Sequence, residues 1–194
     1  EKLEDICDQS GVSSLIPVAF DLEKGDYKSL SKQVRGHFSE IDILINNAGA
    51  LINKKFSKLT AADFDHLMNV NVRSAFLLSR ELLPLFEPNS HIVNISSMGG
   101  YQGSAKFPGL SLYSASKGAL AILSECMAEE LKEYHVSVNC LALGAAQTEM
   151  LAEAFPGYTA PVTAKEMAAY IADFALNGNK LFNGKILAVS QSTP

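Results

Sequence analysis

Apolar runs alternate along this chain with stretches whose apolar residues recur at helical spacing. Continuous apolar runs at 15–20, 41–45, 91–95, 136–143 and 184–190 lack two-residue alternation and predict buried strands. Helical spacing marks 26–38, 60–86, 112–134 and 164–176, and residues 1–9 resemble the end of a further helix. Residues 144–163 indicate mostly loop, with a short helix at 149–155.

Continuous apolar strands joined by helices are typical of a parallel sheet that is covered on both faces. We therefore predict an α/β fold with a doubly wound parallel sheet in three layers, αβα. The chain has no internal repeat, no low-complexity tract and no second composition regime, so residues 1–194 are expected to form a single domain. Thr60 followed by Asp63 predicts a capped helix start.

Composition narrows the function classes. The net charge is −5 and the Lys and Arg residues are scattered, which argues against a nucleic-acid partner. No apolar run approaches the roughly 20 residues that cross a bilayer, so no membrane partner is expected. Cys7, Cys126 and Cys140 lack metal-ligand spacing, which indicates no metal site and reduced core thiols in a cytoplasmic protein.

The richest chemistry lies in residues 94–117, which start in a strand and end in a helix. Ser97 stands where the strand stops, and Tyr113 and Lys117 are spaced to share one face of the following helix. A hydroxyl, a phenol and an ammonium thus meet at the carboxyl end of a strand, where open α/β sheets bind ligands. A buried Tyr with a snorkelling Lys is the structural alternative.

Asn71 is the fourth residue of interest, because it falls on the apolar stripe of its own helix. A buried Asn must find hydrogen-bond partners or cost several kcal/mol, roughly 2–7 by transfer scales. It acts either as a structural polar plug or as part of a site. The stripe consists of Phe64, Leu67, Met68, Ala75, Leu78 and Leu82.

Four motifs occur in order and in matching structural contexts: N-N-A-G at 46–49 after a strand, N-V-N-V-R-S-A-F at 69–76 in a helix, I-S-S at 95–97 ending a strand and Y-S-A-S-K at 113–117 opening a helix. A weaker G-A-A-Q-T-E-M segment follows at 144–150. With these motifs the chain resembles the short-chain dehydrogenase/reductase family over essentially its whole length. The resemblance implies a Rossmann-type fold and, by analogy, an enzyme similar to 3-oxoacyl-carrier-protein reductases.

The resemblance also implies an NAD(P)-dependent oxidoreductase that acts on a small-molecule carbonyl or alcohol. Tyr113 would be the general acid or base, and Lys117, as a nearby cation, would lower the pKa of its phenol. Ser97 would orient the substrate oxygen, with Ser96 as the rival serine. Asn71 would bond its own helix backbone and extend a proton relay from Lys117. The interval between Ser97 and Tyr113 is longer than the family norm, which predicts an enlarged loop beside the substrate.

NAD or NADP is the implied cofactor, and sequence leaves the choice between them open. Asp21 either contacts the adenine ring or caps a helix, and Thr148 would bind the nicotinamide carboxamide although Leu143 replaces the usual proline. The implied cofactor-binding residues are Asp21, Asn46, Ala48, Gly49, Tyr113, Lys117, Gly144 and Thr148.

The family's glycine-rich phosphate loop, T-G-x-x-x-G-x-G, does not occur in these residues. Residue 1 is Glu, and we expect an upstream segment that carries this loop and the N-terminal strands of the sheet. A homodimer or homotetramer paired through the helix at 113–134 is a further implication of the resemblance. The alternative to an enzyme is a family-like binding or interaction protein without catalysis.

Overall fold

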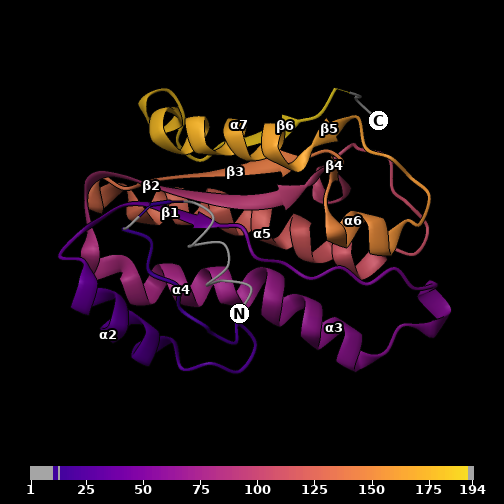
Figure 1. Ribbon diagram of the computed structural model, residues 1–194, viewed down its shortest axis with the longest axis horizontal. Coiled ribbons are helices and arrows are strands. Elements are labelled where there is room, and N and C mark those ends of the chain that lie inside the picture. The colour runs from indigo at the N-terminus through magenta and orange to yellow at the C-terminus, as the bar shows by residue number, and fades with distance from the viewer. Residues whose placement is uncertain (1–10, 13, 192–194) are drawn as a thin grey trace.

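A parallel sheet forms the middle of three layers in the computed structural model, which describes residues 11, 12 and 14–191 (Figure 1). Its strands are β1 (Ile41–Asn46), β2 (Phe86–Ser97), β3 (Ser137–Leu143) and β6 (Ile186–Val189), in the spatial order β1-β2-β3-β6. All neighbouring strands pair in parallel. The predicted α/β fold with a doubly wound parallel sheet is confirmed.

Helices cover both faces of this sheet. Figure 1 shows α2 (Tyr27–His37), α3 (Ala61–Met68), α4 (Ser74–Leu82) and α5 (Ser111–Glu130) on one side and α7 (Ala164–Asn177) on the other. The predicted capped start is present, because Thr60 forms a capping box with Asp63; Asp26, predicted as the first helical residue, is instead the N-cap of α2, and its side chain accepts from Lys28 N. Each cap satisfies backbone N–H groups that the first helical turn leaves unpaired.

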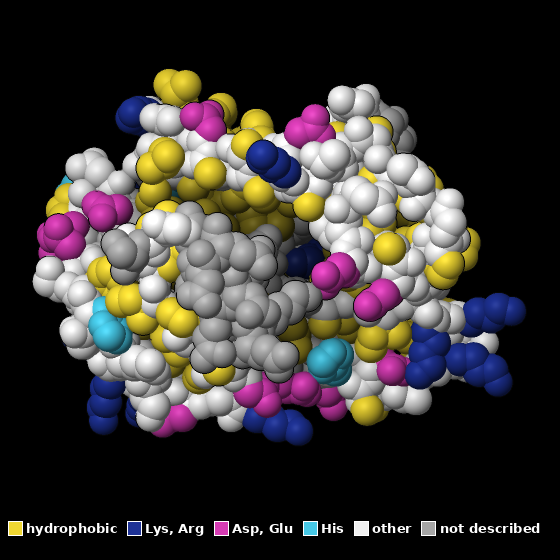
Figure 2. All heavy atoms as spheres, in the orientation of Figure 1, with side chains coloured by type: hydrophobic (Ala, Val, Ile, Leu, Met, Phe, Trp, Pro, Cys, Tyr) yellow, Lys and Arg dark blue, Asp and Glu magenta, His cyan; other side chains and the backbone are white. Residues whose placement is uncertain are grey.

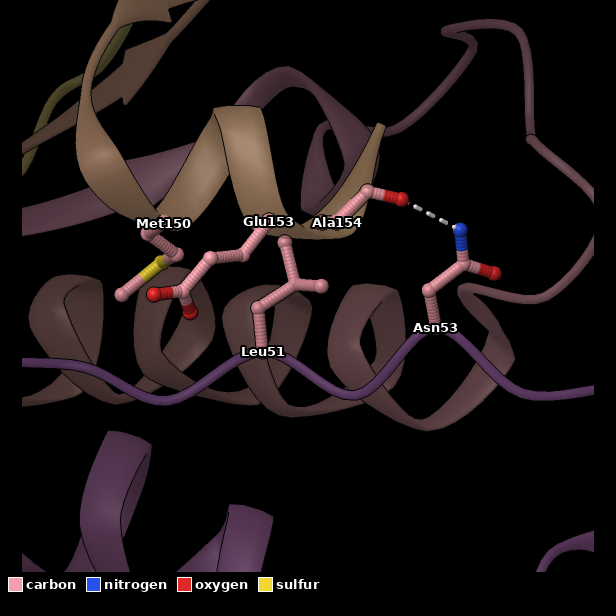
Figure 3. A pocket seen from close by; sticks show the side chains of 5 residues that line it. All are labelled: Leu51, Asn53, Met150, Glu153 and Ala154. Carbon is pink, nitrogen blue, oxygen red and sulfur yellow. Dashed lines mark hydrogen bonds between the residues drawn. The ribbon is translucent and has the colours of Figure 1, made fainter. Parts of the chain in front are cut away.

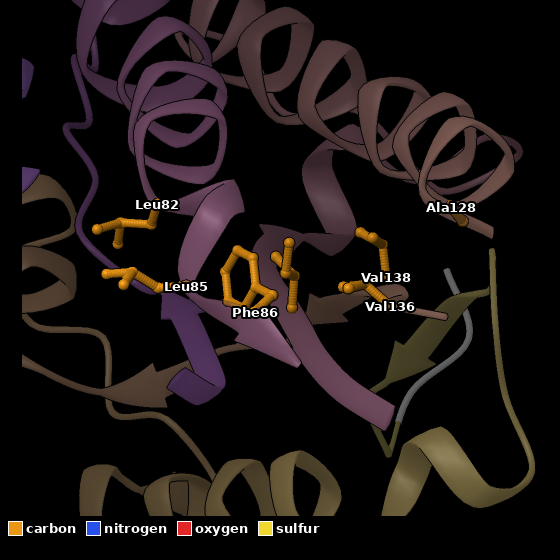
Figure 4. Close-up of a cluster of buried hydrophobic side chains, with 7 residues drawn as sticks. Leu82, Leu85, Phe86, Ala128, Val136 and Val138 are labelled. Atoms are coloured by element: carbon orange, nitrogen blue, oxygen red, sulfur yellow. The ribbon is translucent and has the colours of Figure 1, made fainter. Parts of the chain in front are cut away.

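The core consists of two apolar clusters, one on each face of the sheet. The cluster toward α4 and α5 is drawn in Figure 4 and consists of Leu82, Leu85, Phe86, Ile92, Ala128, Val136 and Val138. The cluster toward α7 consists of Val93, Ile95, Leu141, Phe174 and Ala175. Because successive strand residues point to opposite faces, the continuous apolar runs in β2 and β3 supply both clusters at once.

The helix predicted at 60–86 is divided into shorter elements. A π-helical turn at Asn69–Arg73 separates α3 from α4, and a 3-10 turn at Leu83–Leu85, with Pro near its start, ends the run. Phe86, expected as the helix end, instead begins β2, which is therefore longer than the predicted strand at 91–95. Phe64, expected on the buried stripe, is 48% exposed, whereas Leu67 and Ala75 are buried as expected.

The strand predicted at 15–20 does not form, and this prediction is wrong. Leu15 and Ile16 are 46% and 43% exposed, and β1 is the edge strand of the sheet among the residues that the structure describes. A strand needs a neighbouring backbone for its hydrogen bonds, and Pro17 has no N–H to donate. The predicted end of a helix at 1–9 lies outside the described residues.

Residues 144–163 contain more order than the sequence indicated. Strands β4 (Ala146–Gln147) and β5 (Val162–Thr163) pair in parallel, and the short helix α6 (Glu149–Ala154) lies between them.

The helix predicted at 112–134 appears as α5 with a 3-10 turn at Leu131–Tyr134, and the last strand is shortened to β6. Over the described part of the chain, no helix is both long and apolar enough to cross a membrane.

The cysteines differ from one another. Cys140 is a free, buried thiol in β3, as predicted for a core cysteine. Cys126 lies exposed on α5, so the prediction that it is a core thiol is wrong, and Cys7 lies outside the described residues.

Candidate active site

The site is built where four elements converge at the carboxyl ends of β1 and β2. The first turns of α5 carry Tyr113 and Lys117, β2 ends in Ser97, and the π-helical turn carries Asn71. Gly49 follows β1, and the space where its Cβ would lie is within 3.2 Å of both Lys117 Nζ and Asn71 Oδ1. The fold therefore brings together Asn71, Gly49 and Lys117, which are far apart in sequence.

Asn71 is only 2% exposed, and its amide is fully used by polar partners. Its Oδ1 accepts from Ala50 N at 2.7 Å, and its Nδ2 donates to Ala50 O at 2.9 Å. The family pattern implied bonds to its own helix backbone, but the side chain instead clamps the segment after β1. The π-helical turn places it there, and such turns occur often at functional sites.

Ser116 is a site residue that the sequence analysis did not single out. Its hydroxyl accepts from Asn71 Nδ2 at 2.9 Å and donates to Tyr113 O at 2.8 Å, and it is completely buried. It thus links the π-helical turn to the turn of α5 that carries Tyr113. The available signal was its place three residues after Tyr113, on the same side of the helix.

Lys117 is a buried cation, 4% exposed, whose ammonium donates to Ile95 O at 2.9 Å. Burial lowers the pKa of Lys117 to about 8, while the nearby Cys140 thiol acts in the opposite direction. An ammonium has three donors, and Ile95 O is its one hydrogen-bond acceptor within the described residues. Donors therefore remain for a ligand.

The two serines at the end of β2 have different surroundings. Ser96 is buried, and its hydroxyl donates to Lys117 O at 2.8 Å, which fixes α5 against the strand. The Ser97 hydroxyl accepts from Gly99 N at 3.1 Å, is only partly buried and lies beside the Tyr113 phenol. This difference favours Ser97 over Ser96 as the serine that meets a ligand.

Tyr113 lies partly buried beside Ser97. Burial raises the pKa of the Tyr113 phenol, and a hydrogen bond with Ser97 lowers it in part. Lys117 was expected to lower this pKa, but its ammonium is directed to Ile95 O, and the net shift is upward. At neutral pH the phenol therefore stays protonated, as an ordinary phenol does, and the protonated form is the one that can donate a proton.

The residues of the motif at 46–49, at the end of β1, have two different roles. Asn46 Nδ2 donates to Asn94 Oδ1 at 2.7 Å and to Ser79 Oγ at 3.3 Å, which ties β1 to β2 and α4. Ala48 is exposed, and Gly49 provides the space next to Lys117 where a side chain would collide. Asn46 therefore steadies the sheet, while Ala48 and Gly49 lie at the open edge.

Asp21 stabilises a turn in this structure. Its Oδ1 accepts from Glu23 N at 2.8 Å and Lys24 N at 3.1 Å, and these backbone hydrogen bonds lower the pKa of the Asp21 carboxyl. The prediction that Asp21 caps a helix is wrong, because residues 22–24 form a turn and Asp26 is the N-cap of α2; Asp21 also does not follow a strand. It lies outside the cluster formed by Asn71, Ser97, Tyr113 and Lys117.

Gly144 and Thr148 follow β3 at the same edge of the sheet. Gly144 N donates to Val189 O, and a Cβ at Gly144 would approach Ser190 Oγ to 2.7 Å, so a side chain there would require Ser190 to shift. Thr148 is the N-cap of α6, its hydroxyl accepting from Leu151 N at 3.2 Å. The hydroxyl is thus used in starting α6, whatever else it contacts.

The surface above these residues is hollowed. Figure 2 shows a basic side chain deep in a central hollow, with acidic side chains on the rim. A pocket of about 400 Å³ opens between α6 and residues 50–55, and Figure 3 shows its lining. In the described ranges, His, Cys, Asp and Glu form no group of three that could hold a metal ion.

A parallel sheet with Ser97, Tyr113 and Lys117 at its carboxyl edge defines a Rossmann-type dehydrogenase architecture. The model of the short chain dehydrogenase family matches residues 1–159, and the chain belongs to this family. The resemblance inferred from the four motifs is therefore confirmed at the family level.

Named relatives show how far the similarity extends. Nodulation protein G of a Rhizobium species is 32% identical over 152 residues, which cover 77% of this chain and 61% of that protein. Carbonyl reductase (NADPH) 2 of Sus scrofa is 36% identical over 127 residues, covering 63% of this chain and 49% of that protein. The chain therefore spans about half to three fifths of the length of these curated relatives.

A solved structure extends the comparison to three dimensions. A short chain dehydrogenase from Burkholderia cenocepacia, in complex with NADP, superimposes with a TM-score of 0.74 and 27% identity. The match covers 84% of this chain and 70% of that one. The three-layer arrangement is thus that of a known dehydrogenase.

Proposed function

We propose that the protein is an NAD(P)-dependent oxidoreductase that reduces a small carbonyl compound, or oxidises the corresponding alcohol. One observation carries the proposal: the elements that carry Asn71, Ser97, Tyr113 and Lys117 converge at the carboxyl edge of the sheet, where the Tyr113 phenol lies beside the Ser97 hydroxyl. A protonated phenol beside a serine hydroxyl is the chemistry needed to give a proton to a carbonyl oxygen.

The residues near Lys117 fit the nicotinamide ribose of such a cofactor. Gly49 leaves open the space that a side chain would fill at 3.1 Å from Lys117 Nζ, and this ammonium keeps donors for ribose hydroxyls. When bound, NADH or NADPH would supply the hydride. The glycines that bind the pyrophosphate in this family do not occur in residues 1–194, so we assign no residue to that group.

In the reduction, Ser97 would donate a hydrogen bond to the carbonyl oxygen and hold it against the phenol of Tyr113. As the carbonyl carbon gains hydride, Tyr113 gives its proton to the oxygen, and the alcohol forms. Asn71 and Ser116 hold the turn of α5 that carries Tyr113, because they connect Ala50 to Tyr113 O through consecutive hydrogen bonds. Asn71 and Ser116 are buried, so water does not compete for these supporting hydrogen bonds.

Replacing Tyr113 tests this proposal most directly. In the intact protein, Tyr113→Phe removes the proton donor and retains the ring, so turnover of a carbonyl panel should fall by about 10²–10⁴-fold. NADH and NADPH affinity should change only a few-fold, as measured by fluorescence titration. Unchanged turnover would refute the role of Tyr113, and absence of turnover and of cofactor binding in the wild-type protein would favour a non-catalytic binding protein.

A further inference from the structure

The pocket of about 400 Å³ beside the candidate active site carries a charge that the proposed reaction does not use. Its lining comes from two segments that are distant in sequence: residues 50–55, which follow β1, and α6, which follows β3. Figure 3 shows Met150 and Glu153 hanging from α6 toward the segment that carries Leu51. The lining residues are Leu51, Asn53, Met150, Glu153 and Ala154.

Two anchors connect this pocket to the reacting groups. Ala50, which precedes Leu51, is held on both its N–H and its C=O by Asn71. Further along, Lys54 N donates to Gly109 O at 2.9 Å, just before the helix α5 that carries Tyr113. One wall of the pocket is therefore tied at both ends to the site that would hold the carbonyl.

Asn53 closes the pocket at its far end. Its Nδ2 donates to Ala154 O at 2.9 Å, which joins residues 50–55 to the end of α6 (Figure 3). A Cβ at Gly109, where φ is +91°, would meet Asn53 Oδ1 at 2.1 Å, so glycine is required at that position. Three segments thus meet at Asn53 and fix the distance between α6 and the opposite wall.

Glu153 is the one ionisable side chain among the lining residues. On the opposite wall, Lys54 is paired with Asp63 at 2.7 Å, and Lys55 is exposed and does not line the pocket, so neither compensates the carboxylate. Leu51 and Met150 are apolar, and the Asn53 amide is bonded to Ala154 O. A ligand in this pocket therefore meets a net negative charge and a hydrogen-bond acceptor.

We propose that Glu153 determines substrate charge: the pocket accepts carbonyl compounds whose remote end is cationic or carries a hydroxyl donor, and it disfavours those that end in a carboxylate. This inference rests on the proposed function and names the substrate class for the same site. A ligand charge about 6 Å from the Glu153 carboxylate, at a partly solvated surface, is close enough to change the binding constant, and salt reduces this effect. The selectivity should therefore be roughly tenfold.

Matched aldehydes measure this selectivity in the intact protein. The probes are benzaldehydes with a 4-trimethylammonio, a 4-hydroxymethyl or a 4-carboxy group, assayed by kcat/KM with the preferred cofactor. The wild-type protein should favour the cationic over the anionic probe by about tenfold. Glu153→Gln should reduce that ratio to near one, and Glu153→Lys should reverse it. Glu130→Gln, an exposed position at the end of α5, is the matched control and should leave the ratio unchanged.

Binding of the same probes, measured by isothermal titration, separates the two proposals. If the ratio of dissociation constants for the cationic and anionic probes is the same in the wild-type protein and in Glu153→Gln, the role of Glu153 is overturned, whatever the turnover. If that ratio changes as expected while Tyr113→Phe retains full turnover, the substrate class stands and the proposed mechanism fails.

Discussion

Two buried polar networks lie on opposite faces of the same strands, and they differ in what they leave unused. On the face toward α7, His91 Nδ1 donates to Ala175 O at 2.9 Å, and His91 Nε2 accepts from Asn139 Nδ2 at 3.0 Å. Asn139 completes its bonding with Phe182 O and Lys185 N. Every polar atom of these two side chains has a protein partner, so this network is closed.

The network toward α5 is open. Asn71 and Ser116 are paired within the protein, but the Lys117 ammonium uses one acceptor among the described residues, and Ser97 and Tyr113 are only partly buried. Burial in the closed network stabilises the fold, because each polar group is satisfied. Burial in the open network leaves hydrogen-bond donors without a protein partner in the described part of the chain, so they can bind a ligand. This lowers the stability of the fold and is typical of functional sites.

Replacing Lys117 should show most clearly that the open network supports turnover and not folding stability. Lys117→Met removes the cation of the open network, so turnover should fall by about 10³-fold or more. Folding stability should not fall, because burial opposes the charged form of Lys117 and lowers its pKa to about 8. Stopped-flow turnover and urea denaturation measure the two effects. A loss of stability above about 1 kcal/mol, the usual worth of one hydrogen bond, would contradict this interpretation.

The paired serines at the end of β2 offer a sharper contrast within one network. Ser97→Ala should reduce kcat by roughly 10²-fold, because it removes a donor that stabilises charge on the substrate oxygen. Ser96→Ala removes the bond to Lys117 O, so it should cost about 1 kcal/mol of stability and leave kcat within a few-fold. Equal losses of kcat in the two variants would reject the distinction between them.

The closed network predicts a smaller effect, confined to stability and pH. Burial lowers the pKa of His91, and an added proton on Nε2 would face the Asn139 amide, itself a donor. The folded state therefore binds fewer protons than the unfolded state below about pH 6.5, so stability falls as pH decreases from there. His91→Leu should cost about 1–3 kcal/mol at pH 7 and flatten this decline, with turnover unchanged. Thermal melts from pH 7.5 to 5 measure it, and an identical pH slope in wild type and variant would contradict it.

The sequence predicted the layers and most elements because continuous apolar runs and helix caps are local signals. It failed at 15–20, where an apolar run alone cannot supply the neighbouring strand that a ladder requires. It also placed Phe64 on the buried face, because one helical phase was assumed across 60–86. These errors arise from tertiary contacts that periodicity does not contain.

The candidate site shows the same difference between features that follow from local sequence and features that depend on tertiary contacts. Motif spacing predicted Asn71, Ser97, Tyr113 and Lys117 as site residues, and the fold brings the elements that carry them to the same end of the sheet; their catalytic roles stay a prediction. The direction of the Tyr113 pKa was wrong, because it depends on where the Lys117 ammonium points and on burial, neither of which spacing determines. Ser116 and Glu153 were not found, since their importance comes from segments joined only in three dimensions.

The π-helical turn at Asn69–Arg73 has a consequence for how the helix region can vary. One extra residue in a turn rotates everything after it by about 100° around the axis, relative to an uninterrupted α-helix. The buried face of α3 therefore does not fix which residues of α4 are buried. Asn71 lies in the turn that separates these two helices. Inserting or deleting one residue in this turn would change which residues of α4 point toward the core, without changing the sequence of α4 itself.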